Sequence, residues 1–298
     1  MLRTENFTKD KNIAIYTGKK FKLNALKTNY TGGFKSEKAA EQKLKADIEK
    51  LSDLQEKLYA SDNHGVLIII QAMDAAGKDS TIEHVLKGIN PQGCNITSFK
   101  RPSDKELSHD FLWRTSNALP ERGMIGIFNR SYYEEVLVTK VHPEIILQQS
   151  IPGITKLKHI DNEFWNNRYE SIVNHEKHLA NNGYIILKFF LNVSKEEQKN
   201  RFLERIDNPE KNWKFQFGDI KERGFWNKYM KAYEKAIAET STPKSPWFVI
   251  PADNKWFMQT AVCDIILNTL QQMNLKFPEP TAEARQQLTE AKNILLTS

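Results

Sequence analysis

The sequence contains only two cysteines, Cys94 and Cys263, among its 298 residues. They lie far apart and lack the short spacing that metal-binding cysteines share. Isolated cysteines of this kind usually pack as small hydrophobic side chains. We therefore expect two buried thiols rather than a disulfide or a metal site, and a reducing, cytoplasmic location.

Long apolar runs are also absent. The longest, residues 66–70, has the length of a β-strand and is too short to span a bilayer. The first ten residues mix charged side chains without an apolar run, which argues against a secretory signal. We expect no membrane segment and no membrane partner.

Internal repeats and low-complexity linkers are missing as well, so no obvious boundary divides the chain. A chain of this length approaches the upper limit of what one hydrophobic core can serve. We predict a single domain over residues 1–298, with an N-terminal arm and helix at about 1–60 and a helical lid at about 194–238.

The chain has no large excess of charge. Its 43 basic and 37 acidic residues leave a formal charge of +6. That value suits nucleic acid, anionic lipid or polyphosphate equally well, so the positions of the basic residues matter more than their number.

Helical and strand-like patterns alternate along the chain. Residues 35–60 carry apolar side chains every three or four positions, which predicts an amphipathic helix. The run 66–70 is rich in β-branched residues and is typical of a central parallel strand buried on both faces. Further strands are predicted at 95–99, 124–128, 184–191 and 247–250, and helices at 78–88, 106–119 and 255–270. This alternation predicts an α/β sandwich around a mostly parallel sheet.

A phosphate-binding loop follows the run 66–70. Small residues lead to Gly77 and Lys78, where the next helix begins, so that backbone N–H groups and a lysine can hold phosphate oxygens. The loop departs from the usual spacing, with Ala72 at the first glycine position and Asp79 directly after the lysine. On the alternative interpretation Lys78 is a solvated lysine at a helix start; the flanking strand and helix favour phosphate. The predicted phosphate-binding residues here are Ala75, Ala76, Gly77 and Lys78.

Asp74 lies within this loop, where a carboxylate is unfavourable beside phosphate unless it binds a metal or accepts a proton. A helix-capping role is the alternative. We favour Mg²⁺ coordination or activation of the attacking phosphate, because phosphoryl transfer needs a cation that neutralises the transferring group.

A second polar cluster follows strand 124–128, at the sheet edge where α/β proteins bind ligands. Arg130 is predicted to neutralise charge on a transferring phosphoryl group; alternatively it pairs with Glu134 or Glu135 at the surface. Asn129 stands where many P-loop enzymes have a metal-binding aspartate and can orient a metal-bound water.

Residues 194–238 are unusually charged and read as a helix, a break at 207–209 and another helix. Arg201 and Arg205 are four residues apart and therefore share a helical face from which both can reach one polyanion. Lys214 is a further predicted phosphate-binding residue. A solvated helical face is the alternative to a lid that excludes water.

Several strings taken together resemble polyphosphate kinase family 2. They are Asp74-Ala75-Ala76-Gly77-Lys78-Asp79, Asn90-Pro91-Gln92-Gly93, His109-Asp110-Phe111-Leu112-Trp113-Arg114, Phe128-Asn129-Arg130-Ser131, Arg201-Phe202-Leu203-Glu204-Arg205, Asn212-Trp213-Lys214-Phe215 and Pro251-Ala252-Asp253-Asn254-Lys255-Trp256. The resemblance extends over about 32–272. It implies a P-loop kinase-like three-layer α/β/α fold with a helical lid.

The resemblance further implies Mg²⁺-dependent, reversible phosphoryl transfer between inorganic polyphosphate and nucleotides. Asn129 and the single domain are similar to the branch that phosphorylates AMP and ADP alike. The implied catalytic residues are Asp74, Lys78, Asn129, Arg130, Arg201 and Arg205. The implied nucleotide-binding residues are Asp79, Lys100, Arg101, Asp110, Asn129 and Glu134.

Two other functions use the same residues differently. An ATP-dependent nucleoside monophosphate kinase would use the same loop and lid with a second nucleotide in place of the phosphate chain. A non-enzymatic polyanion binder would use the basic excess alone, but it gives no role to Asp74. We expect polyphosphate and adenine nucleotides as ligands, no nucleic acid, and a homo-oligomer.

Overall fold

The computed structural model describes residues 6–17 and 21–298, so residues 1–5 and 18–20 of the predicted N-terminal arm lie outside the described residues. Its centre is a six-stranded sheet in the order β1-β6-β5-β2-β4-β3. The strands are β1 (Ala14–Ile15), β2 (Gly65–Ala72), β3 (Cys94–Ser98), β4 (Ile125–Asn129), β5 (Tyr184–Asn192) and β6 (Trp247–Pro251). All neighbouring pairs are parallel except β1 and β6. The predicted α/β fold with a mostly parallel sheet is confirmed.

Strand β2 occupies the centre of this sheet, as its apolar run predicts. It pairs with β4 on one side and β5 on the other, and all eight of its residues are buried. A strand with helices over both faces has no solvent-exposed side, which explains the run of branched apolar residues.

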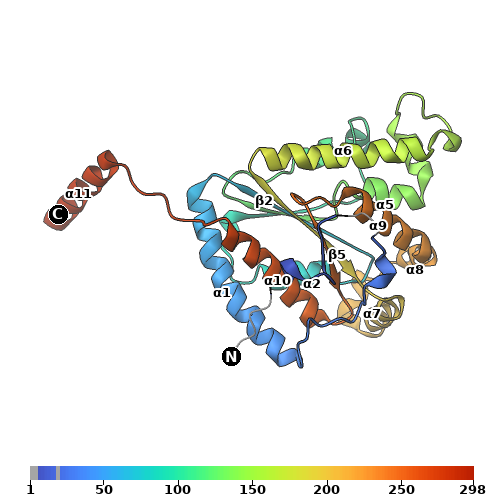
Figure 1. The fold of residues 1–298 in the computed structure, drawn as a ribbon, viewed down its shortest axis with the longest axis horizontal. Coiled ribbons are helices and arrows are strands. Elements are labelled where there is room, and N and C mark those ends of the chain that lie inside the picture. Colours follow the sequence, from blue (N-terminus) through green and yellow to red (C-terminus); the bar gives the residue numbers. More distant parts are fainter. Residues whose placement is uncertain (1–5, 18–20) are drawn as a thin grey trace.

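Helices cover both faces of the sheet (Figure 1). One layer contains α1 (Glu37–Ser61), α2 (Lys78–Val85) and α10 (Lys255–Gln272). The other contains α5 (Glu134–Val141), α6 (Asn162–Asn181) and α9 (Trp226–Thr240). Near the carboxyl ends of the strands lie α7 (Lys195–Asp207), the 3₁₀ turn η6 (Pro209–Lys214) and α8 (Phe217–Gly224).

A buried ion cluster joins the two ends of the chain. Lys43 in α1 donates a hydrogen bond to Asp264 in α10, with 2.7 Å between Nζ and Oδ1. The other carboxylate oxygen of Asp264 accepts the backbone N–H of Phe7, at 2.9 Å. Both charged side chains are almost fully buried. Asp264 therefore links the N-terminal arm, α1 and α10 through one buried carboxylate.

The prediction of one helix over 106–119 is wrong. The structure has two short helices instead, α3 (Asp104–Leu107) and α4 (Trp113–Ser116). Ser103 and Glu106 form a capping box that starts the first helix early. Between them, the side chain of Asp110 accepts the backbone N–H of Leu112, a local hydrogen bond that competes with helix formation.

Residues 194–238 divide into two kinds of structure. Helix α7 ends at Asp207, as the break at 207–209 predicts. In α9, however, Tyr229, Tyr233 and Ile237 are buried, and the helix packs on α5 and α6. The residues after Gly224 thus belong to a layer of the core, and only α7, η6 and α8 overhang the sheet.

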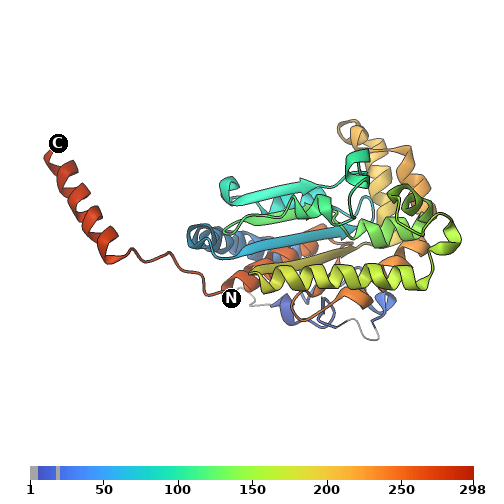
Figure 2. The same cartoon turned by 90° about the horizontal axis from the view of Figure 1, so that it is seen from above.

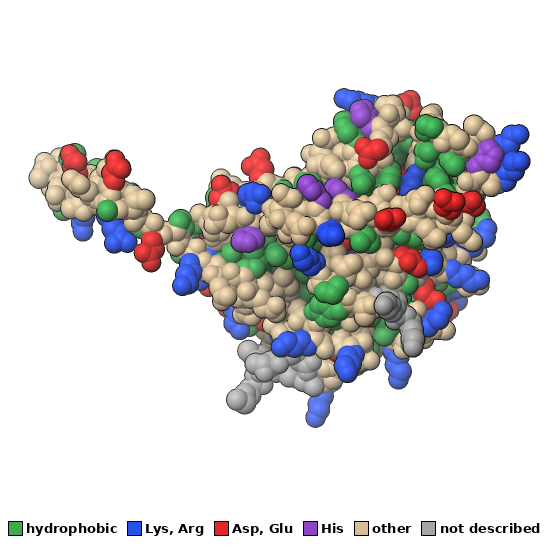
Figure 3. Space-filling model, turned by 45° about the horizontal axis from the view of Figure 1, so that its top comes forward, with side chains coloured by type: hydrophobic (Ala, Val, Ile, Leu, Met, Phe, Trp, Pro, Cys, Tyr) green, Lys and Arg blue, Asp and Glu red, His purple; other side chains and the backbone are tan. Residues whose placement is uncertain are grey.

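Helix α11 (Ala282–Thr297) stands away from the rest of the molecule at the end of an extended segment (Figure 2). None of its residues is buried. Over the face seen in Figure 3, basic and acidic side chains are interspersed and do not gather into one continuous basic patch.

Both cysteines are free, as the sequence predicts, but the prediction that both are buried is right only for Cys263. Cys263 is buried and Cys94 is half-buried, and burial raises the pKa of the Cys94 thiol to about 11. Among residues 6–17 and 21–298, no helix has the length and apolar character that crossing a membrane requires.

Candidate active site

The predicted phosphate loop and the Asn129-Arg130 pair meet at the carboxyl ends of two adjacent strands. Ile70 of β2 lies opposite Asn129, the last residue of β4. The loop leaves β2 after Ala72 and enters α2 at Lys78. The backbone N–H of Arg130 donates to the carbonyl of Ile70, at 3.1 Å, which fixes the two segments side by side.

The loop bends through two residues in the left-handed region. Ala75 has a φ of 60° and Gly77 a φ of 104°. The conformation at Gly77 favours glycine, whereas a Cβ there would meet only the flexible end of Met258, 3.0 Å from its Cε. Ala72 is the last residue of β2 and is not in the left-handed region, which explains why alanine serves where the usual pattern has glycine.

Lys78 is the first residue of α2, and its ammonium group faces the loop. Nζ lies 3.4 Å from the carbonyl oxygen of Ala72. Burial lowers the pKa of Lys78 and the neighbouring charge of Arg130 lowers it further, while Asp74, Glu134 and Asp79 act in the opposite direction. A cation in such an incompletely hydrated position is well placed to bind phosphate oxygens.

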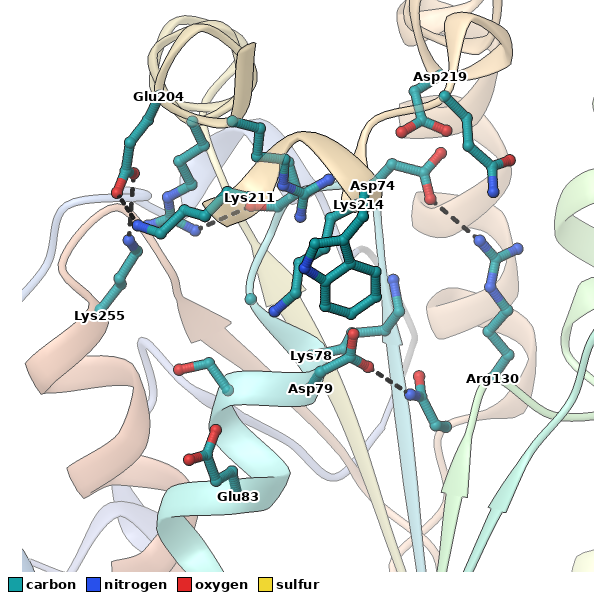
Figure 4. Close-up of a pocket in the computed structure, with 18 of the residues that line it drawn as sticks. Asp74, Lys78, Asp79, Glu83, Arg130, Glu204, Lys211, Lys214, Asp219 and Lys255 are labelled. Carbon is teal, nitrogen blue, oxygen red and sulfur yellow. Dashed lines mark hydrogen bonds and ion pairs between the residues drawn. The ribbon is translucent and has the colours of Figure 1, made fainter. Parts of the chain in front are cut away.

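Arg130 forms ion pairs with two carboxylates at once, and Figure 4 shows the one with Asp74. Its Nη2 lies 3.0 Å from Oδ1 of Asp74, and its Nη1 lies 3.1 Å from Oε2 of Glu134. Glu134 and then Asp74 raise the pKa of Arg130 against the effect of burial. The φ of Arg130 is 66°, a strained value for a residue with a side chain. The ion pair between Arg130 and Glu134, which was the alternative interpretation of Arg130, is therefore formed. Arg130 also contacts the phosphate loop through Asp74.

Asn129 contacts the first turn of α2. Its Nδ2 donates to Oδ1 of Asp79, at 2.7 Å. Two residues predicted to bind nucleotide are thereby joined across the gap between β4 and α2. The side-chain amide brings no additional negative charge to this position.

These residues line a cavity of about 720 Å³ between the sheet edge and the overhanging segment α7–η6–α8. Basic residues outnumber acidic ones among its walls. The predicted residues that line it are Asp74, Ala75, Gly77, Lys78, Asp79, Lys100, Asn129, Arg130, Arg201, Arg205 and Lys214. A cavity of this size and charge can hold two phosphate-containing ligands.

Four predicted residues lie elsewhere. Ala76 is a fully buried residue of the loop itself, and Glu134 reaches the cavity only through Arg130. Arg101 is exposed outside the cavity walls. Asp110 lines a separate, very small pocket beside Glu106 and Arg114. The structure thus brings Asp79, Lys100 and Asn129 of the predicted nucleotide set together, without Arg101 or Asp110.

Arg201 and Arg205 share a face of α7, but their guanidinium groups differ. Arg201 is buried, and its Nη atoms donate to backbone carbonyls of Ala76 and Ala252 at 2.7 and 2.6 Å. Its Nε donates to Glu197, at 2.8 Å. Arg205 forms no ion pair with the residues that the structure describes. Arg201 therefore fastens α7 to the phosphate loop, whereas Arg205 is available to an anion.

We expect glutamine substitutions to separate these two roles. Arg201→Gln should lower the free energy of unfolding by about 2–4 kcal/mol, because several buried carbonyls lose their donor. Arg205→Gln should leave stability unchanged and weaken binding of tripolyphosphate by about 10-fold or more, the loss of one charge-assisted contact. Urea unfolding and calorimetric titration measure the two effects. Equal effects of the two substitutions on stability would contradict the assignment.

Several residues of the cavity wall were not predicted as site residues: Ser80, Glu83, Glu204, Lys211, Trp213, Gln216, Asp219 and Lys255. The side chain of Asp219 in α8 points toward that of Asp74 (Figure 4). Burial and the charge of Asp74 raise the pKa of Asp219. Lys211 and Lys255 both pair with Glu204. Lys255 lies within the string 251–256 that resembles the family, so the sequence offered a reason to predict it as a site residue. No motif near Asp219 indicates a role for that residue.

The carboxylates at the cavity fit a magnesium ion that is bound together with phosphate. No group of three or more potential ligand side chains is present in the described part of the chain. Mg²⁺ typically takes only one or two protein carboxylates and completes its shell with substrate phosphates and water. Asp74, with Asp219 opposite, supplies ligands of that kind.

Comparison with known proteins gives one consistent result. A family model described as polyphosphate kinase 2 matches residues 34–278. The ADP-polyphosphate phosphotransferase of Rhodopseudomonas palustris is 49% identical over 97% of this chain and 99% of its own. The AMP/ADP-polyphosphate phosphotransferase of Meiothermus ruber is 43% identical over 88% of this chain and 92% of its own. The crystal structure of polyphosphate kinase 2 from Arthrobacter aurescens TC1 superposes with a TM-score of 0.83 at 37% identity, over 93% of this chain and 95% of that one.

Proposed function

Because the chain belongs to the polyphosphate kinase 2 family, we propose that it is a polyphosphate:nucleotide phosphotransferase which reversibly converts AMP to ADP and ADP to ATP. The observation that supports this most directly is the cavity itself. A phosphate loop, a bridging arginine and a basic overhanging segment surround one space that is large enough for a nucleotide and the end of a phosphate chain.

The reaction needs no general base. An oxygen of the acceptor nucleotide's terminal phosphate attacks the last phosphorus of the chain, whose bond to the preceding bridging oxygen breaks. The chain leaves one unit shorter, with its negative charge on that oxygen. The attacking oxygen is already ionised near neutral pH, because the second pKa of a phosphate monoester is about 6. A metal-binding role for Asp74 therefore explains more than proton abstraction.

Lys78 and Arg130 hold the transferring group and offset its charge. Arg130 is poised for this because a phosphate can replace Asp74 or Glu134 as partner of its guanidinium group. Asp74, with Asp219 opposite, would hold Mg²⁺, which supplies positive charge to the transferring phosphoryl oxygens when bound. We propose that α7, η6 and α8 form the lid and exclude water, which competes as an acceptor.

The proposals that ADP is an acceptor and that AMP is an acceptor are supported by different observations. The relatives named above differ, since one name specifies ADP and the other AMP and ADP. Acceptance of both rests on the name of the Meiothermus ruber relative and on the resemblance of Asn129 and the single domain to the branch that phosphorylates AMP and ADP alike. The cytoplasmic location and the homo-oligomer remain predictions that rest on composition and family resemblance.

Incubation of the purified protein with AMP, Mg²⁺ and polyphosphate, without ATP, tests the proposal. Chromatography should show ADP first and ATP later. ADP alone would restrict the acceptor to AMP. Absence of product with polyphosphate, together with AMP phosphorylation by ATP, would instead identify a conventional nucleoside monophosphate kinase.

A further inference from the structure

We propose that Trp213 binds the nucleobase of the acceptor nucleotide by stacking on it. This inference rests on the proposed function and adds a residue that determines how the nucleotide, as distinct from the phosphate chain, is recognised. Trp213 lies in η6, in the middle of the overhanging segment, and lines the cavity together with Lys78 and Asp79.

The exposure of Trp213 is unusual. Its side chain is 77% exposed, more than any other large hydrophobic residue in the described part of the chain. Tryptophan is ordinarily among the most buried side chains on average, because its ring has a large apolar surface. An indole ring left in water at the mouth of a binding cavity has free surface available for a ligand.

The turn that carries Trp213 is firmly held. The side chain of Asn212 donates to the carbonyls of Arg205 and Ile206 at the end of α7, both at 2.7 Å. At the start of the turn, Oδ1 of Asn208 accepts the backbone N–H of Glu210. After it, the ring of Phe215 contacts that of Phe202, with 6.4 Å between centroids. The turn is thus tied on both sides of Trp213, and its indole is presented outward by a fixed backbone.

Among the described residues, Trp213 is the only aromatic one that lines the cavity. Apart from Trp213, the described residues that line it are charged, polar or as small as glycine and alanine. The phosphate chain is anionic along its whole length and has no flat apolar part. Of the two substrates, only the nucleotide carries a π surface, which is the partner that an indole prefers.

Lys214 places a positive charge beside the same ring. Its Nζ lies 5.0 Å from the centroid of the Trp213 ring. An indole and an ammonium group in consecutive residues match the two parts of a nucleotide, a flat base joined to phosphate. Stacking distinguishes poorly among bases because every base has a π face, so we expect GDP to bind nearly as well as ADP.

The test compares the affinities of three ligands, each titrated separately by calorimetry in the presence of Mg²⁺. ADP has a base and phosphates, tripolyphosphate has phosphates alone, and ribose 5-phosphate has sugar and phosphate without a base. Trp213→Ala should weaken ADP binding between about 5-fold and 150-fold, the range for one base–aromatic stack. The affinities of the other two ligands should not change. Trp213→Phe should restore most of the ADP affinity.

Phe217→Ala is the matched control, because Phe217 is 69% exposed in the same overhanging segment but does not line the cavity. It should leave all three affinities unchanged, and unfolding curves should show that every variant is folded. Equal weakening of ADP and tripolyphosphate by Trp213→Ala, or no weakening of ADP, would overturn the inference. The test measures binding and not turnover. The affinities would therefore still decide the role of Trp213 if polyphosphate-driven transfer were not observed.

Discussion

Replacing Lys78 with methionine is expected to lower kcat for transfer to ADP by about 10²- to 10³-fold, the usual effect of removing one charge-stabilising donor from an enclosed site. Methionine keeps the length and much of the volume of the side chain. The thermal stability should stay the same or rise. Burial lowers the pKa of Lys78, which means that the folded state disfavours its charge relative to the unfolded chain, and methionine removes that cost.

Lys87→Met provides the control for this change. Lys87 lies just beyond the other end of α2, is exposed and is outside the cavity, so the substitution alters the net charge equally. Its kcat should equal that of the unmodified protein. A Lys78→Met variant that retains near-normal kcat would remove Lys78 from the mechanism.

Asp74→Asn is expected to reduce transfer by about 10³-fold or more, because the charge on the transferring phosphoryl group is then poorly neutralised. Asparagine keeps the shape of the side chain and an oxygen that can accept from Arg130. Two measurements separate a metal role from a role in holding Arg130. One is the Mg²⁺ concentration that gives half-maximal rate, and the other is Mn²⁺ binding in the presence of tripolyphosphate, followed by electron paramagnetic resonance.

If Asp74 is a metal ligand, Asp74→Asn should raise the Mg²⁺ concentration that gives half-maximal rate and should weaken Mn²⁺ binding. If Asp74 acts only by orienting Arg130, the half-maximal Mg²⁺ concentration and the Mn²⁺ affinity should match those of the unmodified protein while kcat falls. Asp219→Asn should resemble Asp74→Asn with a smaller effect, since Asp219 faces Asp74 from the lid.

Local sequence patterns predict the sheet and the loop well because both depend on neighbouring residues. The apolar run after Gly65 places the central strand, and the small residues before Lys78 place the phosphate loop. The helix predicted over 106–119 fails for an equally local reason, the side chain of Asp110. This Asx hydrogen bond has no signature in the spacing of apolar residues.

The roles of individual lid residues depend on contacts that the sequence does not show. Arg201 and Arg205 have the same side chain and share a helical face. Only the fold brings the carbonyls of Ala76 and Ala252 against one of them and leaves the other facing the cavity. For the same reason Asp219 was not predicted, because Asp74 is distant in sequence and only the fold brings the two side chains near each other.

The buried cluster at Asp264 has a consequence for synthesis on the ribosome. Phe7 and Lys43 are among the first described residues to emerge, yet both bind Asp264 in α10, and β1 pairs with β6. The packing of α1 against α10, its most extensive contact with another helix, therefore cannot form until nearly the entire chain has been translated. We expect the nascent protein to stay open to chaperones throughout elongation and to close cooperatively only after α10 has left the exit tunnel.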